Sequence, residues 1–75
     1  MSVDEDYFAL GSALRVLRRK AGMTQEQAGA AVGVGGKHIS AAELGERGLS
    51  YKTILALTRA YRATLSDLAR EIERA

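Results

Sequence analysis

A few side chains of this chain are of types that take part in catalysis, but none has the neighbours that catalysis needs. His38 is the only histidine, and it lacks a partner set for a catalytic base or a metal ligand. Glu43 and Glu46 are close enough in sequence for a carboxylate pair, yet no titratable cluster accompanies them. The glycine-rich stretch 33–36 lacks the Gly-Lys-Ser/Thr ending and the preceding strand of a phosphate loop. We therefore expect no enzyme, no metal, no cofactor and no small-molecule ligand.

Length and composition point to one small helical domain. The chain has 75 residues, no cysteine and no proline, which excludes disulfides and cysteine-ligated zinc. No apolar run approaches the ~20 residues that span a bilayer, and the start is acidic, unlike a signal peptide. These features predict a cytoplasmic protein with a single domain over residues 1–75, of which 1–5 form a flexible acidic N-terminus.

Charge is unevenly distributed along the chain. From Arg15 to Arg62 there are nine basic residues against three acidic ones, a net charge of +6, although the whole chain carries only +2. A basic middle between less basic ends is compatible with a surface that faces phosphates. An ordinary solvated mixture of charges is the alternative, and charge alone does not exclude it.

Apolar spacing, with many Ala and Leu residues, predicts five helices and no strand. The first starts near Asp4 or Asp6 and stops before Gly22, and the second follows Thr24 and runs to about Val32. The third runs from Gly35 or Gly36 to Leu44, the fourth from Tyr51 to about Tyr61, and the fifth starts at Thr64. The residues expected to face inward are Leu10, Leu14, Leu17, Ala21, Ala28, Val32, Ile39, Ala42, Glu43, Ile54, Leu57, Thr58, Tyr61, Leu65, Leu68 and Ile72.

The second and third helices are joined by a tight turn with a recognisable spacing. Gln25 starts the helix that Thr24 caps, a small residue follows at Gly29, and Gly33 permits the positive φ of the turn. Val34 and Ile39 are apolar and can lock the two helices together. This arrangement predicts a helix-turn-helix, whose second helix can enter the major groove of DNA.

Over Leu10 to Ala69, about four fifths of its length, the chain resembles the Cro/CI-like, or XRE, family of helix-turn-helix DNA-binding domains. The shared features occur in the same order and at the same spacing. They are an arginine pair in the first helix, Thr24-Gln25, Gly33-Val34, Ile39-Ser40, Glu43-x-Gly45 and the cap Ser50. The resemblance implies an all-α, compact five-helix lambda-repressor-like domain.

The resemblance also implies roles for individual residues. Arg18 and Glu43 would form a partly buried structural ion pair. DNA phosphates would be bound by Thr24, Gln25, Arg47, Ser50, Tyr51 and Lys52, which position the domain without reading sequence. Base readout would fall to Gly36, Lys37, His38, Ser40 and Ala41, where Lys37 can donate to guanine and Ala41 can touch a thymine methyl. Because glycine and alanine are frequent on this surface, DNA shape is expected to carry much of the recognition.

By the same resemblance we expect a transcriptional regulator of controller or phage type that binds a pseudo-palindromic operator as a homodimer. Apolar residues that a core of this size does not easily bury are the expected dimer interface: Leu49, Tyr51, Leu55 and Ile72. The alternative is a protein–protein interaction module, such as an antitoxin or a helix-turn-helix fold with weak or lost DNA binding.

Overall fold

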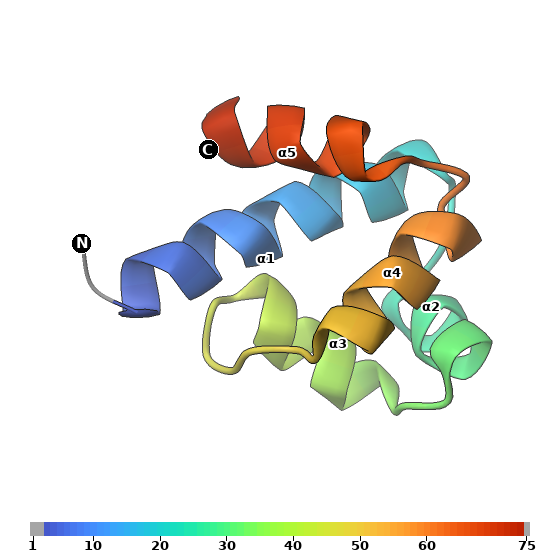
Figure 1. The fold of residues 1–75 in the computed structure, drawn as a ribbon. Helices are drawn as coiled ribbons and strands as arrows, with labels where there is room; N and C mark the ends of the chain where they lie inside the picture. The colour runs from blue at the N-terminus through green and yellow to red at the C-terminus, as the bar shows by residue number, and fades with distance from the viewer. Residues whose placement is uncertain (1–2, 75) are drawn as a thin grey trace.

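The prediction of an all-α fold with five helices is confirmed. The computed structural model describes residues 3–74, and no strand occurs within them. In chain order the helices are α1 (Val3–Lys20), α2 (Gln25–Val32), α3 (Gly36–Glu43), α4 (Tyr51–Ala60) and α5 (Leu65–Arg74). Figure 1 shows α1 and α5 lying side by side, while α2, α3 and α4 form a second group beside α1.

The first helix begins close to the start of the chain. Helix α1 begins at Val3 and so includes residues 3–5 of the segment that we expected to be flexible, while residues 1 and 2 lie outside the described residues. Acidic side chains in the first turn of a helix interact favourably with its positive end, which suits Glu5 to a helical position. The helix ends as expected, because Gly22 adopts a left-handed φ of 71°.

Side-chain caps mark the starts of α2, α4 and α5. Thr24 and Gln27 form a reciprocal capping box at the start of α2, and the Ser50 hydroxyl accepts the backbone N–H of Thr53 at the start of α4. Thr64 and Asp67 cap α5 in the same reciprocal way, with distances of 2.8 and 3.1 Å. The Thr64 N–H donates to the Asp67 carboxylate, and this hydrogen bond lowers the pKa of that group.

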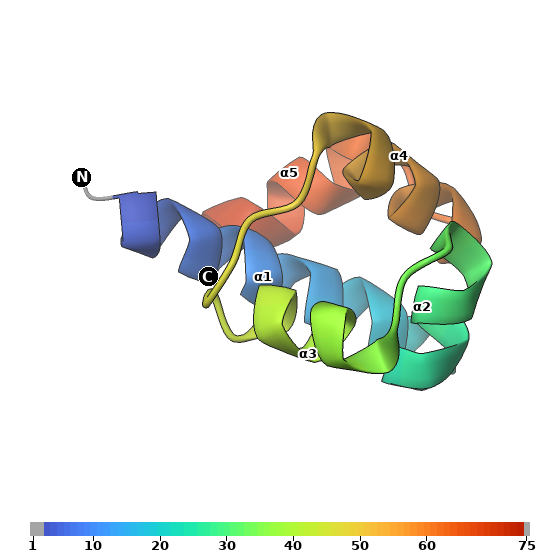
Figure 2. The same ribbon diagram turned by 90° about the horizontal axis from the view of Figure 1, so that it is seen from below.

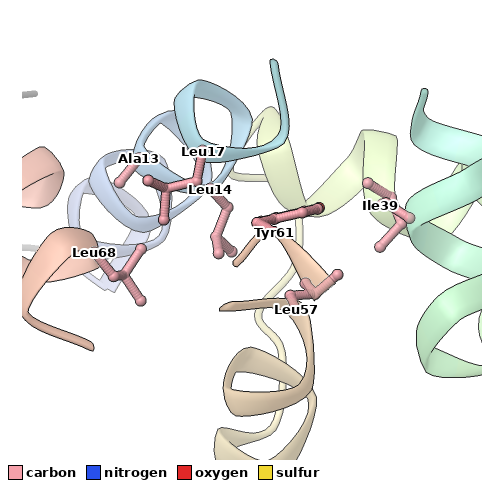
Figure 3. Packing of buried hydrophobic residues seen from close by; sticks show 8 residues of the cluster. Ala13, Leu14, Leu17, Ile39, Leu57, Tyr61 and Leu68 are labelled. Carbon is pink, nitrogen blue, oxygen red and sulfur yellow. The ribbon is translucent and has the colours of Figure 1, made fainter. Parts of the chain in front are cut away.

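The core lies where α1, α4 and α5 meet the helix-turn-helix formed by α2 and α3. Its buried apolar residues are Ala13, Leu14, Leu17, Ala28, Ile39, Leu57, Tyr61 and Leu68. Figure 3 shows the Tyr61 ring at the centre of this cluster, between the α1 leucines and Leu57. The second view shows α3 lying beneath α1, so one face of α1 supports the helix-turn-helix while α5 packs on another (Figure 2).

Two residues expected to face inward do not. Ala21 lies in the turn after α1 and is exposed, because the helical stripe ends one residue earlier. Leu65 is the first residue of α5 and remains 44 % exposed, whereas Leu68 and Glu71, three and six positions later, turn toward α1. Burial of Glu71 is tolerated because Lys20 and Arg74 each donate to its Oε1 atom at 3.3 Å.

A glycine inside α1 sets how closely α3 approaches. A Cβ on Gly11 would overlap the carbonyl oxygen of Ala42 and lie 2.8 Å from that of Glu43. The backbones of the two helices are therefore in contact at this crossing.

Tyr61 carries a buried polar group that the fold does not satisfy. The ring is 5 % exposed, and its hydroxyl has no hydrogen-bond partner within the described part of the chain. Burial, and secondarily the negative charge of Glu43, raise the pKa of Tyr61 to about 12, while Arg18 acts in the opposite direction. The hydroxyl therefore contributes no hydrogen bond to stability and resists ionisation.

Replacing Tyr61 with phenylalanine is expected to leave the free energy of unfolding at pH 7 unchanged or to raise it by up to about 1 kcal/mol, because no hydrogen bond is lost. A folded-state pKa above the unfolded value of 10.0 means that the parent protein loses stability as pH rises from 10 to about 12. The Tyr61→Phe variant should not show this loss of stability at high pH. Urea unfolding at pH 7, 10 and 11.5 measures both effects, with Tyr51→Phe as the exposed control; equal alkaline slopes in parent and Tyr61→Phe would refute the assignment.

Candidate nucleic-acid interface

The start of α2 and the first turn of α3 meet at a surface hollow. Its lining consists of Gln25, Glu26, Gly36, Lys37 and Ser40. A residue expected to bind phosphate, Gln25, is thus next to three of the residues expected to read bases. The hollow brings together the N-terminal ends of two helices, where backbone amides and the helix dipole favour negatively charged groups.

The turn between α2 and α3 brings these ends together, and it depends on two glycines. Gly33 has a left-handed φ of 80°, and its N–H donates to the carbonyl of Gly29. Val34 also donates to that carbonyl, at 2.8 Å. A Cβ on Gly29 would lie 2.5 Å from the Val34 oxygen, so only glycine allows the chain to return this closely over α2.

Arg18 and Glu43 form a bidentate ion pair that ties α1 to the end of α3. Arg18 Nε donates to Glu43 Oε2 at 2.6 Å and Nη2 donates to Oε1 at 3.0 Å, while Nη1 donates to the Met23 carbonyl at 2.8 Å. The two side chains are only 10 % and 3 % exposed. The hydrogen bonds to Glu43 raise the pKa of Arg18 above its usual value, and burial opposes this effect.

Gln25 takes part in the same network. Its Nε2 donates to Glu43 Oε1 at 3.0 Å, so the amide is oriented by the buried ion pair rather than left free in solvent. An amide nitrogen carries two hydrogens, and the second remains able to donate. The arrangement allows Gln25 to bind a phosphate while Glu43 fixes its orientation, a connection that the sequence did not indicate.

The six residues expected to bind phosphate divide into two groups. The hydroxyls of Thr24 and Ser50 already accept backbone N–H groups as helix caps, and Gln25 is bonded to Glu43. Three others are exposed and form no hydrogen bond or ion pair within residues 5–74: Arg47, Tyr51 and Lys52. The second group lies in the loop after α3 and the first turn of α4, and these side chains are free to contact a ligand.

The residues expected to read bases share the outer side of α3. Lys37 is exposed, and His38, Ser40 and Ala41 are half-buried. The side chains of Lys37, His38 and Ser40 have no hydrogen-bond partner in the described part of the molecule. The opposite side of the helix buries Ile39, Ala42 and Glu43 against the core. Lys37 is therefore free to contact a ligand, and the half-buried His38 and Ser40 have no hydrogen bond in the described residues that such a contact would displace.

The residues expected in a dimer interface are only partly available to a partner. Leu49 and Ile72 are half-buried and pack against the core, and Leu55 is half-buried as well. Tyr51 is 66 % exposed and lies one helical turn before Leu55 on α4. Leu44 and Phe8 are also exposed, at 57 % and 59 %.

Two kinds of site are not found in the described residues. In that part of the chain, His, Asp and Glu do not gather in a group of three or more that could hold a metal ion. No helix among residues 3–74 combines the length and apolar character needed to cross a membrane.

Comparison with known proteins agrees with this geometry. A family model described as "Helix-turn-helix domain" matches residues 9–71. The chain belongs to this helix-turn-helix family. Its α2 and α3 are the helix-turn-helix itself, and α1, α4 and α5 support it. No match was found among curated proteins.

Two solved structures with this fold are similar to the chain over most of its length. Both are structures of the clp gene regulator ClgR from Corynebacterium glutamicum. The first has a TM-score of 0.86 and 28 % identity, covering 91 % of this chain and 72 % of that one. The second has a TM-score of 0.85 and 28 % identity, covering 91 % and 87 %. Membership in this family supports a DNA-binding protein.

Proposed function

We propose that this helix-turn-helix protein is a transcriptional regulator that binds a pseudo-palindromic operator in duplex DNA as a homodimer. The observation that carries the proposal is the hollow between α2 and α3, where the start of α2 and the exposed Lys37 of α3 lie together. In this geometry α3 enters the major groove and the start of α2 crosses the phosphate backbone. Similarity to the gene regulator ClgR supports the same function.

Phosphate contacts would come from both sides of α3. Gln25 lies at the start of α2, and Arg47, Tyr51 and Lys52 are exposed beyond the end of α3. Such contacts fix the position of the domain on DNA and make affinity depend on salt. Lys37, His38 and Ser40 would then reach base edges, with Lys37 donating to guanine O6 or N7.

Dimerisation would use Tyr51 and Leu55 on α4, together with the exposed parts of Leu49 and Ile72. An exposed tyrosine beside half-buried aliphatic residues is typical of the residues that anchor protein interfaces. A two-fold axis would place two copies of α3 in successive major grooves, about one turn or ~34 Å apart. The two-fold symmetry of the selected DNA sequence tests this part of the proposal.

Titration of purified protein against random duplex DNA at 50 and 200 mM salt tests DNA binding itself. Because each neutralised phosphate releases a counterion, we expect affinity to fall steeply between the two conditions. Negligible affinity at the lower concentration, or an affinity independent of salt, would instead support the protein–protein module. Two observations favour this second function. Leu44 and Phe8 are exposed apolar residues, and α3 carries few long side chains.

Replacing Lys52 with alanine is expected to weaken binding to all duplexes by a similar factor and to reduce the slope of log affinity against log salt by about 1, since one phosphate contact is lost. Fluorescence anisotropy across a salt series measures both quantities. Arg70→Ala removes a cation from α5, which lies on the far side of the molecule from α3 (Figures 1 and 2), and should change neither. A changed sequence preference in Lys52→Ala would show that this lysine reads bases.

A further inference from the structure

An acidic side chain lies among the residues expected to contact DNA. Glu26 is exposed on α2 and lines the hollow with Gly36, Lys37 and Ser40. Within the described residues its carboxylate has neither a hydrogen bond nor an ion pair. The ordinary explanation is a favourable interaction with the positive end of α2, where Glu26 occupies the first turn. That explanation accounts for the charge but not for the position of the side chain against α3.

The position follows from the missing side chain of Gly36. A Cβ on Gly36 would lie 3.0 Å from Glu26 Cγ and 3.3 Å from Glu26 Cα. Glu26 thus occupies the space beside the first residue of α3 that any larger residue would need. The first residue of α3 therefore lies against the Glu26 side chain of α2, and Glu26 and Lys37 line the same hollow.

We propose that Glu26 is a specificity-determining residue that accepts a hydrogen bond from the N4 amino group of a cytosine in the major groove. The inference rests on the proposed function, because it requires α3 to lie in that groove. An ionised carboxylate is only an acceptor. It pairs with the cytosine amino group and is repelled by the acceptors of guanine and thymine.

Lys37 complements this preference. The ammonium group is only a donor and suits guanine O6 and N7, the acceptors that face the major groove on the other strand of a C·G pair. Both side chains line the same hollow, so an acceptor and a donor are presented on the same surface. Together they disfavour the reversed orientations G·C and T·A, and they favour cytosine over adenine because adenine also presents its N7 acceptor to the carboxylate. This assigns base discrimination to a surface on which Gly36 has no side chain and Ala41 has only a methyl group.

Selection from a random duplex library with the parent protein, Glu26→Gln and Glu26→Ala tests the proposal. The parent should enrich cytosine at one position of each half-site. Both variants should lose most of that enrichment, because only the Lys37 contact to guanine on the other strand remains, and the affinity ratio between the cytosine site and its best single-base alternative should fall about tenfold. Glutamine keeps the size of the side chain but also donates, so it tolerates guanine and thymine. Glu46→Gln, an exposed acid in the loop after α3, is the matched control and should leave the motif unchanged.

The contrary outcomes separate this inference from the function on which it rests. If the parent selects a motif and both Glu26 variants select the same motif, with affinity raised equally for all sequences, Glu26 acts only by repelling phosphates and the inference is overturned. If the parent itself enriches no sequence, the proposed function fails and the inference fails with it. Thermal melting of each variant verifies folding, which an exposed side chain should not disturb.

Discussion

Replacing Arg18 with alanine is expected to lower the free energy of unfolding by about 3–5 kcal/mol, because the Glu43 carboxylate is then left buried without its partner. Glu43 is 3 % exposed and accepts two of its hydrogen bonds from Arg18, so solvent cannot replace the guanidinium. A domain of this size has only a few kcal/mol of stability in total. We therefore expect Arg18→Ala to be largely unfolded at 37 °C, as measured by circular dichroism and urea unfolding.

Two further variants separate loss of the ion pair from loss of packing. Arg19→Ala removes the neighbouring exposed arginine and should change stability by less than about 0.5 kcal/mol. The double variant Arg18→Met/Glu43→Leu replaces both charges with apolar groups and should regain much of the lost stability. A melting temperature of Arg18→Ala within error of the parent would show that the pair is not buried in solution.

Replacing Gly11 with alanine is expected to lower the free energy of unfolding by about 2–3 kcal/mol, because the new methyl group overlaps the backbone of α3. The sign of this effect is informative. Alanine in a helix interior is normally more favourable than glycine by about 1 kcal/mol, so helix propensity alone predicts the opposite result. Because the obstructing atoms are backbone carbonyls, no side chain can move aside, and α1 and α3 must separate.

Gly35→Ala is the control for this substitution. Gly35 precedes α3 with φ −78° and ψ 160°, and its Cβ would meet nothing within 4 Å. At this position alanine is a poorer N-cap, which lowers stability, but it makes the unfolded chain less flexible, which raises it. The free energy of unfolding should therefore change by no more than about 0.5 kcal/mol. If Gly11→Ala were as stable as Gly35→Ala, the backbones of α1 and α3 could not be in contact at Gly11.

Local sequence signals were sufficient for the helices because each signal and its effect lie within a few residues. Thr24 and Gln27 are three positions apart, Ser50 caps the residue three positions later, and Gly33 needs only its own backbone to make the turn. Such patterns can be recognised without knowing the tertiary structure. The period of apolar residues likewise predicted the buried Leu14, Leu17 and Leu57.

The features that the sequence did not indicate all depend on contacts between distant elements. In the sequence alone, Gly11 is only a residue of low helix propensity inside a helix. Its role is evident only in the structure, where the carbonyls of α3 lie against it. Burial of Glu71 depends on Lys20, 51 positions away, and orientation of Gln25 depends on Glu43. The position of the Glu26 side chain against α3 could not be predicted, because it depends on the turn that brings Gly36 next to it. Composition and periodicity carry no information about these pairs.

The candidate interface was therefore predicted in outline but not in its chemistry. The residues assigned to α3 do lie on its outer side, because helical periodicity fixes which side faces the core. Which side chains are free to bind was not predictable, since capping by Thr24 and Ser50 and the bond from Gln25 to Glu43 use groups that the sequence leaves open. The assignments to phosphates and bases remain proposals.

Selection of binding sites from a random duplex library with the purified protein tests the central claim most directly. The account predicts enrichment of a two-fold symmetric sequence whose half-sites are centred about one helical turn, ~34 Å, apart. It also predicts a C·G pair at a fixed position in each half. Recovery of no enriched sequence, together with negligible affinity for duplex DNA at 50 mM salt, would contradict the proposal that this helix-turn-helix protein acts on DNA.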